Sequence, residues 1–167
     1  MIKYLLLSLF SIFIFVFSFD SVFKNESHFR TGVVFNFSSL KHDRIGHVES
    51  ADRIKIIHEY LIDKDILSQV RQFKERVATH DELLLAHTPE YIEEIHSLSK
   101  KDIGFFTNDK WSPYTSKYAF EAAASAAGSL IELSEAVAKS EVTNGFAVIR
   151  PPGHHSTKNT AMGYCIF

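Results

Sequence analysis

Apolar residues along the chain alternate between short continuous runs and longer stretches with helical spacing. The runs at residues 32–37 (GVVFNF) and 146–149 (FAVI) are short and rich in β-branched and aromatic side chains, which predicts buried strands. Apolar positions at helical spacing occupy much of the sequence between them. Strands that alternate with helices predict an α/β fold with a mostly parallel sheet flanked by helices.

The expected helices begin at residues that favour helix starts. Thr79 opens a T-x-x-E capping box, and Thr88 precedes a proline that suits the first helical position. Ser50 precedes a helix in which Ile54, Ile57, Leu61 and Ile62 share one face, and Thr115 precedes the alanine-rich stretch 116–140. Residues 38–50 are predicted to form a loop, and residues 101–114 a loop long enough to be functional.

An uncharged apolar run covers residues 4–19 and follows Lys3. This arrangement is typical of a signal peptide or signal anchor over residues 1–19, with residues 20–30 as a linker. We therefore expect a secreted, periplasmic or membrane-anchored protein, with possible membrane contact through residues 4–19. A buried core helix or a misassigned start codon, in a cytoplasmic protein, is the alternative.

Composition narrows the function classes for this chain of 167 residues. The formal net charge is -2, from 18 Lys+Arg against 20 Asp+Glu, so there is no positive field of the kind that nucleic-acid binders use. One cysteine excludes an internal disulfide framework and a thiolate zinc finger. We expect no nucleic-acid partner.

Two adjacent histidines follow the second apolar run. His154 and His155 come directly after the turn sequence R-P-P-G, which ends the strand predicted at residues 146–149. Sites in open α/β sheets collect beyond the carboxyl ends of strands, where an imidazole can transfer protons near neutral pH. A solvated turn with two accidental histidines is the alternative that position alone leaves open.

The histidine turn also carries a resemblance. R-P-P-G-H-H followed by G-Y-C resembles the histone deacetylase and acetoin-utilisation family of zinc-dependent deacetylases. Four further blocks in the same order resemble that family: TGVVFN, HDRIGHVESADRIKIIHEYL, ATHDELLLAHTPEYIEEI and SPYTSKYAFEAAASAAGSL. The resemblance covers residues 31–167 and implies an arginase-like α/β fold that hydrolyses an acyl-amide such as acetyl-lysine or an acetylated polyamine.

The resemblance also implies roles for individual residues. His155 would act as general base and acid, with His154 supporting the oxyanion and the attacking water. Gly163 and Tyr164 stand at the family's Gly-Phe position and would form one wall of the substrate channel, where tyrosine adds a hydroxyl. Asp109 is the possible acid at the channel rim.

Zinc is the cofactor that the resemblance implies for a full-length domain. The family holds it with an Asp-x-His pair and a further Asp, and no Asp-x-His occurs in this sequence. We therefore expect residues 31–167 to be the amino-terminal portion of a deacetylase domain, truncated before the zinc ligands. Such a chain would be inactive alone and would need the missing carboxyl-terminal half. A non-catalytic membrane-tethered or exported remnant, or binding module, is the alternative.

The remaining histidines and the cysteine provide no substitute ligand set. His42 and His47 flank a loop, while the H-E-x-x-H spacing that starts at His58 fails because position 62 is isoleucine. We expect these histidines, Glu93-x-x-His96 among them, to be surface or hydrogen-bonded residues. His87 is predicted to be a capping or packing histidine, and Cys165 a small buried residue.

Overall fold

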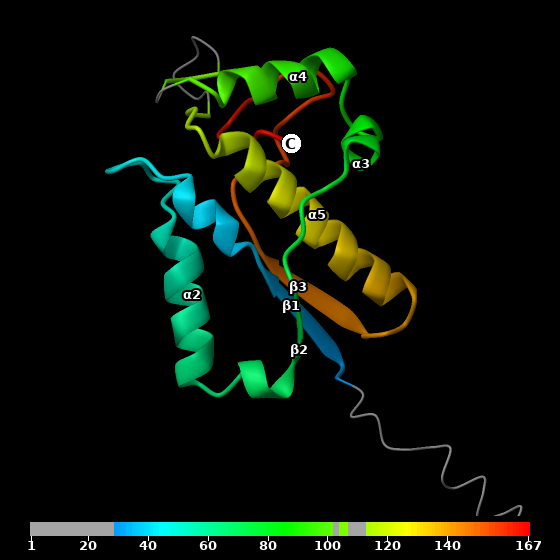
Figure 1. The fold of residues 1–167 in the computed structure, drawn as a ribbon. Helices are drawn as coiled ribbons and strands as arrows, with labels where there is room; N and C mark the ends of the chain where they lie inside the picture. Colours follow the sequence, from blue (N-terminus) through cyan, green and yellow to red (C-terminus); the bar gives the residue numbers. More distant parts are fainter. Residues whose placement is uncertain (1–28, 102–103, 107–112) are drawn as a thin grey trace, which may run out of the picture.

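The computed structural model describes residues 29–101, 104–106 and 113–167, with a three-stranded parallel sheet at its centre (Figure 1). The strand order is β2-β1-β3, where β1 is Thr31–Phe35, β2 is Arg71–Phe73 and β3 is Asn144–Val148. Both neighbours pair with β1 in parallel register. The predicted α/β class and parallel sheet are confirmed. The prediction that the second apolar run is a buried strand is wrong in part: β3 lies at the edge of this sheet, Phe146 is 62% exposed, and only Val148 of β3 is buried. The pattern did not indicate β2, whose three residues are too few to show an alternation.

Four α-helices and two short 3-10 helices accompany the sheet in the described residues. They are η1 (Phe37–Lys41), α2 (Asp52–Asp63), η2 (Leu67–Gln69), α3 (His80–Leu84), α4 (Pro89–Leu98) and α5 (Ala119–Ala138). The segment 38–50, predicted as a loop, therefore begins inside η1.

The sheet lies between α2 and α5 (Figure 1). Val33 and Phe35 pack with Ile54 of α2, because alternate residues of a strand point to the same face. Gly32, on the opposite face, lies so close to α5 that an added Cβ would come within 2.7 Å of Leu133 Cδ1. Gly32 thus lets α5 approach the sheet closely.

The alanine-rich helix α5 also packs against the chain that follows β2. Ala78 N donates to Ala124 O at 2.8 Å, and a Cβ at Gly128 would lie 2.6 Å from the carbonyl carbon of Val77. The narrow face was predicted to pack against the sheet. It does so, and it also contacts this connecting segment, which brings α3 and α4 alongside α5.

The first residues of the helices show which local sequence signals are sufficient to predict a helix start. The capping box at Thr79 and the cap at Thr88 are both present, so these two predictions are confirmed. Thr115 does not cap α5: its hydroxyl accepts from Gly104 N at 2.9 Å, and Tyr118 is the N-cap residue. Ser50 accepts from Asp52 N at 3.1 Å, but Ala51 rather than Ser50 is the N-cap residue of α2.

One predicted core position of α2 is wrong. Ile62 is 56% exposed, because it lies about 100° around the helix from Leu61 and so points away from the packed face. Ile57 and Leu61 are packed against the core as the spacing predicts.

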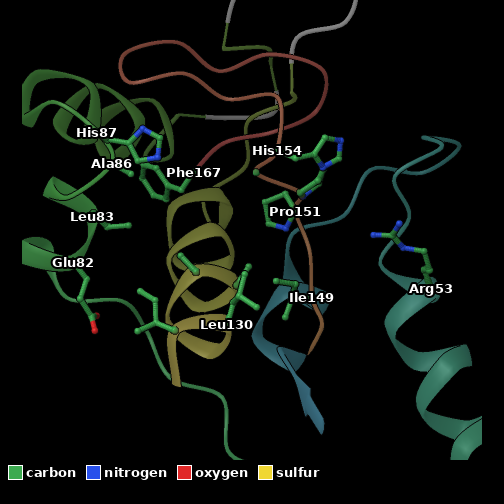
Figure 2. Close-up of a pocket in the computed structure, with 15 residues that line it drawn as sticks. Arg53, Glu82, Leu83, Ala86, His87, Leu130, Ile149, Pro151, His154 and Phe167 are labelled. Atoms are coloured by element: carbon green, nitrogen blue, oxygen red, sulfur yellow. The ribbon is translucent and has the colours of Figure 1, made fainter. Parts of the chain in front are cut away.

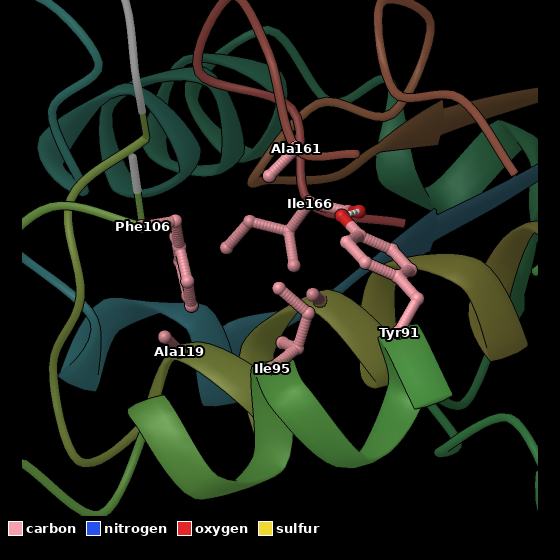
Figure 3. Packing of buried hydrophobic residues seen from close by; sticks show 7 residues of the cluster. Tyr91, Ile95, Phe106, Ala119, Ala161 and Ile166 are labelled. Atoms are coloured by element: carbon pink, nitrogen blue, oxygen red, sulfur yellow. Dashed lines mark hydrogen bonds between the residues drawn. The ribbon is translucent and has the colours of Figure 1, made fainter. Parts of the chain in front are cut away.

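The last residues of the chain pack between α4 and α5. Ile166 is fully buried against Tyr91, Ile95 and Ala119, and the Tyr91 hydroxyl donates to Ile166 O at 2.5 Å (Figure 3). Residues 164–167 form no strand, and only an isolated bridge joins Met162 and Cys165. Side-chain burial rather than strand pairing holds this segment.

Residues 1–28 lie outside the described residues, and with them the predicted leader and nearly all of the linker. Among the helices of the described part, none is long and apolar enough to cross a bilayer.

Candidate active site

The two histidines lie on an irregular turn beyond the carboxyl end of β3. A cis peptide bond joins Arg150 to Pro151, and Ser156 N donates to Gly153 O to close the turn. The rings of His154 and His155 are 4.3 Å apart between centroids and tilted by 58°. Both side chains are exposed in this structure. Two imidazoles that face solvent side by side can accept and return protons to a bound molecule.

The backbone of the histidine turn is attached to the segment around Cys165. His155 N donates to Cys165 Sγ at 3.2 Å, and Ile166 N donates to Pro152 O at 3.2 Å. Cys165 is fully buried, as predicted, and burial raises the pKa of its thiol. The thiol therefore stays protonated and serves here as a hydrogen-bonding partner of the turn.

Gly163 and Tyr164, the predicted channel wall, form a tight turn against His155. Met162 and Cys165 exchange backbone hydrogen bonds at 3.2 and 2.9 Å around two residues of positive φ, +59° at Gly163 and +71° at Tyr164. That is the geometry of a type I′ turn. A Cβ at Gly163 would lie 2.8 Å from His155 Cδ2, so only glycine leaves room for the imidazole.

Tyr164 in turn contacts the 42–49 segment, which we call the entrance loop. The rings of Tyr164 and His47 meet edge to face at 4.9 Å, and His47 also contacts Tyr114 at 5.0 Å. The structure thus brings the histidine turn, the predicted channel wall and the entrance loop together, although they are far apart in sequence.

Arg150 links these segments from inside the protein. It is fully buried, and its guanidinium donates to Ser39 O at 2.8 Å, to Glu49 O at 2.9 Å, to the Tyr114 hydroxyl at 2.9 Å and to His42 O. The residue before the Pro-Pro-Gly turn therefore fixes the course of the entrance loop.

Glu49 brings a negative charge to this arginine. Its Oε1 lies 2.6 Å from Arg53 Nη2 and 3.8 Å from Arg150 Nε. Neither Glu49 Oε1 nor Arg150 Nε has a well-aligned hydrogen bond, so Glu49 contributes as a nearby charge. The sequence indicates Arg150 only as the first residue of the R-P-P-G-H-H motif. No signal in the sequence around it indicates its burial, since most of β3, the strand before it, is itself exposed.

His42 and His87 are structural, as the sequence analysis expected. His42 is buried, its Nδ1 lies 2.7 Å from Ser116 Oγ, and desolvation followed by the charge of Arg150 lowers its pKa to about 3. His87 Nδ1 lies 3.0 Å from Thr157 O, and burial lowers its pKa as well. Both rings are therefore neutral near pH 7.

No group of three His, Cys, Asp or Glu side chains that could hold a metal ion occurs within the described ranges. The residues present there do not fit a zinc site by themselves. Asp109, the predicted rim acid, lies outside the described residues.

An apolar cavity of about 620 Å³ lies beside the histidine turn (Figure 2). Leu83 of α3, Leu130 of α5, Ile149 and Pro151 line it, and His154 stands at its edge. One imidazole of the pair thus borders an apolar space, while the other contacts the Gly163–Tyr164 turn.

The fold and this arrangement define an α/β domain whose histidine pair lies at the carboxyl end of a parallel strand. The model of the histone deacetylase domain family matches residues 47–167. The chain therefore belongs to the histone deacetylase family, whose members are amide hydrolases.

Individual relatives agree with that assignment. Histone deacetylase 5 of Arabidopsis thaliana is 34% identical over 83% of this chain and 22% of its own length. Polyamine deacetylase HDAC10 of Danio rerio is 32% identical over 72% of this chain and 18% of its own length. The crystal structure of the HDA15 HD domain superposes with a TM-score of 0.75 at 31% identity, over 81% of this chain and 40% of that one. The chain thus spans about a fifth of the length of these curated relatives.

Proposed function

We propose that this chain supplies the histidine pair and one channel wall of a deacetylase that hydrolyses acyl-amides of the acetyl-lysine or acetylated polyamine type. His155 would take a proton from the attacking water and return one to the leaving amine, and His154 would support the water and the developing oxyanion. The observation that carries the proposal is the exposed pair of imidazoles beyond β3, packed against the Gly163–Tyr164 turn within a chain of this family.

Zinc is the cofactor that we infer for the complete domain, since the family is generally zinc-dependent. The described part of this chain has no three-residue ligand group, and no Asp-x-His occurs in the sequence. We infer that other polypeptide must supply the ligands, either in a longer product or in a companion chain. The 167-residue chain alone is then inactive.

Measurement of acetate release tests this proposal. We expect no chelator-sensitive acetate release from the purified 167-residue chain with an acetyl-lysine peptide or N-acetylspermidine. A fusion to the part of the HDA15 HD domain that this chain does not match should be active. That activity should be lost in His155→Ala and kept in the control His96→Ala, whose half-exposed side chain contacts Glu93 and Phe120 rather than the histidine turn. Chelator-sensitive turnover by the isolated chain would contradict the expected need for further polypeptide.

The apolar run at residues 4–19 supports a second proposal, that the chain is exported or membrane-anchored. A non-catalytic tethered module would share this location but would not gain activity in the fusion. Amino-terminal sequencing of the protein from fractionated cells tests the location, and an intact Met1 in the soluble cytoplasmic fraction would contradict it.

A further inference from the structure

The entrance loop forms a second pocket, on the side of Tyr164 that faces His47. It has a volume of about 360 Å³ and is lined by residues 44–48, Phe105 and Tyr164. Tyr164 belongs both to this pocket and to the predicted channel wall. A substrate in the channel would therefore lie next to the pocket. We call it the entrance pocket.

Arg44 supplies the one permanent charge among the side chains that line the entrance pocket. Its guanidinium stacks on the ring of Phe105, with Cζ 4.6 Å from the ring centroid, so the charge is held in place. Among the described residues it forms no salt bridge, and its Nη1 is buried without a hydrogen-bond partner. A guanidinium nitrogen in that state is costly, and because the charge has no counter-ion among the described residues, it would stabilise an anion bound in the pocket.

A second arginine in a similar setting has the carboxylate partner that Arg44 does not have among the described residues. Arg71 stacks on Phe73 in almost the same way, at 4.7 Å, but it also pairs with the carboxylate of Glu141 at 2.9 Å. The acids nearest to Arg44 in the chain have other partners. Asp43 accepts from Ala51 N at 3.0 Å, and Glu49 lies between Arg53 and Arg150.

The entrance pocket has a second donor. Glu49 N donates to His47 Nδ1 at 3.1 Å, so Nδ1 is an acceptor and the ring N–H is at Nε2. No carboxylate side chain of the described residues lines the pocket. Its side chains therefore present a cation and an imidazole N–H within apolar walls.

We propose that the entrance pocket binds a carboxylate of the substrate, next to the acylated amine that enters the channel. This inference rests on the proposed function and decides between its two substrate classes. A peptide provides such a carboxylate, either as an acidic side chain beside the acetyl-lysine or as the α-carboxylate of a terminal acetyl-lysine. The only charged groups of an acetylated polyamine are its ammonium groups, which the guanidinium of Arg44 repels.

Binding measurements on the 167-residue chain test this directly. Fluorescence anisotropy would compare three labelled probes: an amidated acetyl-lysine peptide with neutral neighbours, the same peptide with aspartate on both sides, and a peptide that ends in acetyl-lysine with a free carboxylate. Competition by N-acetylspermidine provides the polyamine arm. Succinate, followed by NMR at the Gly46 and Val48 amides, reports on the pocket without any acyl group.

We expect the better carboxylate probe to bind at least fivefold more tightly than the neutral peptide at low salt, and which probe binds better identifies the source of the carboxylate. Arg44→Gln should abolish that preference, and Arg44→Glu should reverse it. Arg71→Gln, the matched control, should leave it unchanged. Thermal unfolding of each variant shows that these differences do not come from loss of the fold.

The possible failures are distinct. Acetyl-lysine peptides that bind without regard to charge would overturn the carboxylate site and leave the proposed function in place. Succinate binding that depends on Arg44, with no binding of any acetylated probe to the isolated chain or to the fusion described above, would support the pocket as an anion site and contradict the proposed function. Equal affinities in the wild type and in Arg44→Gln for every probe would overturn the inference.

Discussion

Asn36 and Arg150 bind each other through reciprocal hydrogen bonds at the carboxyl ends of β1 and β3. Arg150 N donates to Asn36 Oδ1 at 3.0 Å, and Asn36 Nδ2 donates to Arg150 O at 2.6 Å. Both residues are fully buried. The amide side chain thereby replaces the strand pairing that ends at Phe35 and Val148. It leaves the Arg150 side chain free to hold the entrance loop.

Arg150→Met should therefore be strongly destabilising. The change retains the Asn36 contacts to the backbone but leaves Ser39 O, His42 O and Glu49 O without this donor. We expect the free energy of unfolding to fall by about 3–5 kcal/mol, because a buried charge partner and its acceptors are left unpaired.

Urea denaturation measures this loss, with Arg71→Met as the control. Arg71 and Glu141 form an exposed pair, so that change should cost about 1 kcal/mol or less. Equal losses in the two variants would show that the buried network contributes little.

Gly163→Ala should disturb His155 as well as the turn. The residue has a φ of +59°, and the new methyl group would lie 2.8 Å from His155 Cδ2. Gly46→Ala is a matched control, because Gly46 has a φ of +78° with nothing within 4 Å of an added Cβ. Each change should cost about 1–2 kcal/mol for the backbone strain.

Only Gly163→Ala should also shift the imidazole resonances of His155 in a histidine-selective NMR spectrum. Unchanged His155 signals in both variants would mean that the ring has room to move away and that the glycine is needed for φ alone.

His42 should make the protein less stable as the pH falls. Its pKa is about 3 in the folded chain against an ordinary value of 6.5, so between these values the unfolded chain binds the proton and the folded chain does not. Its contribution to stability is complete above pH 6.5 and is lost as the pH falls towards 3, by roughly 1.4 kcal/mol per pH unit.

Urea titrations at pH 7.5, 6.0 and 5.0 measure this dependence. His87, whose pKa is also lowered, acts with the same sign. His42→Gln should flatten the profile, whereas His96→Gln, at a half-exposed site, should leave it unchanged. A profile that is just as steep without His42 would assign the effect to other groups.

Gly128→Ala should destabilise α5 although alanine is the better helix former. A Cβ at this position would meet the backbone of the segment after β2, at 2.6 Å from Val77 C. In an exposed helix the same change would stabilise by about 1 kcal/mol. Here we expect a loss of about 1–3 kcal/mol from overpacking against backbone that cannot move aside.

Ser134→Ala, on the exposed face of the same helix, is the control for propensity and should be neutral or slightly stabilising. Thermal unfolding of both variants compares the signs. A more stable Gly128→Ala variant would show that the backbone of residues 76–78 moves aside to make room for the new methyl group.

Local patterns were sufficient where one segment determines the outcome. The apolar runs of β1 and β3, the capping box at Thr79 and the proline after Thr88 all act within a few residues, and the structure contains each of them. Thr115 has equally good capping chemistry, yet its hydroxyl is used by Gly104 from a different segment. Propensity cannot anticipate that competition.

The same distinction between local and long-range determinants holds for the candidate site. The histidine pair was found because its motif is contiguous, and its position beyond β3 follows from the strand that precedes it. The burial of Arg150 depends on Ser39, Glu49 and Tyr114, which come from distant parts of the chain. Nothing local to an arginine beside two prolines indicates that it is fully buried.

The order of strands in the sheet has a consequence for synthesis of the protein. Both neighbours of β1 come later in the chain, and its register with β3 joins residues such as Thr31 and Asn144. At ordinary rates of translation, the ribosome needs several seconds or more to add these roughly 110 residues. During that time Val33, Val34 and Phe35 lack the strand that covers one edge of β1 and the helix α5 that covers one of its faces. The nascent chain therefore exposes this apolar strand until β3 has been synthesised, and unpaired apolar strands are prone to aggregate during that time.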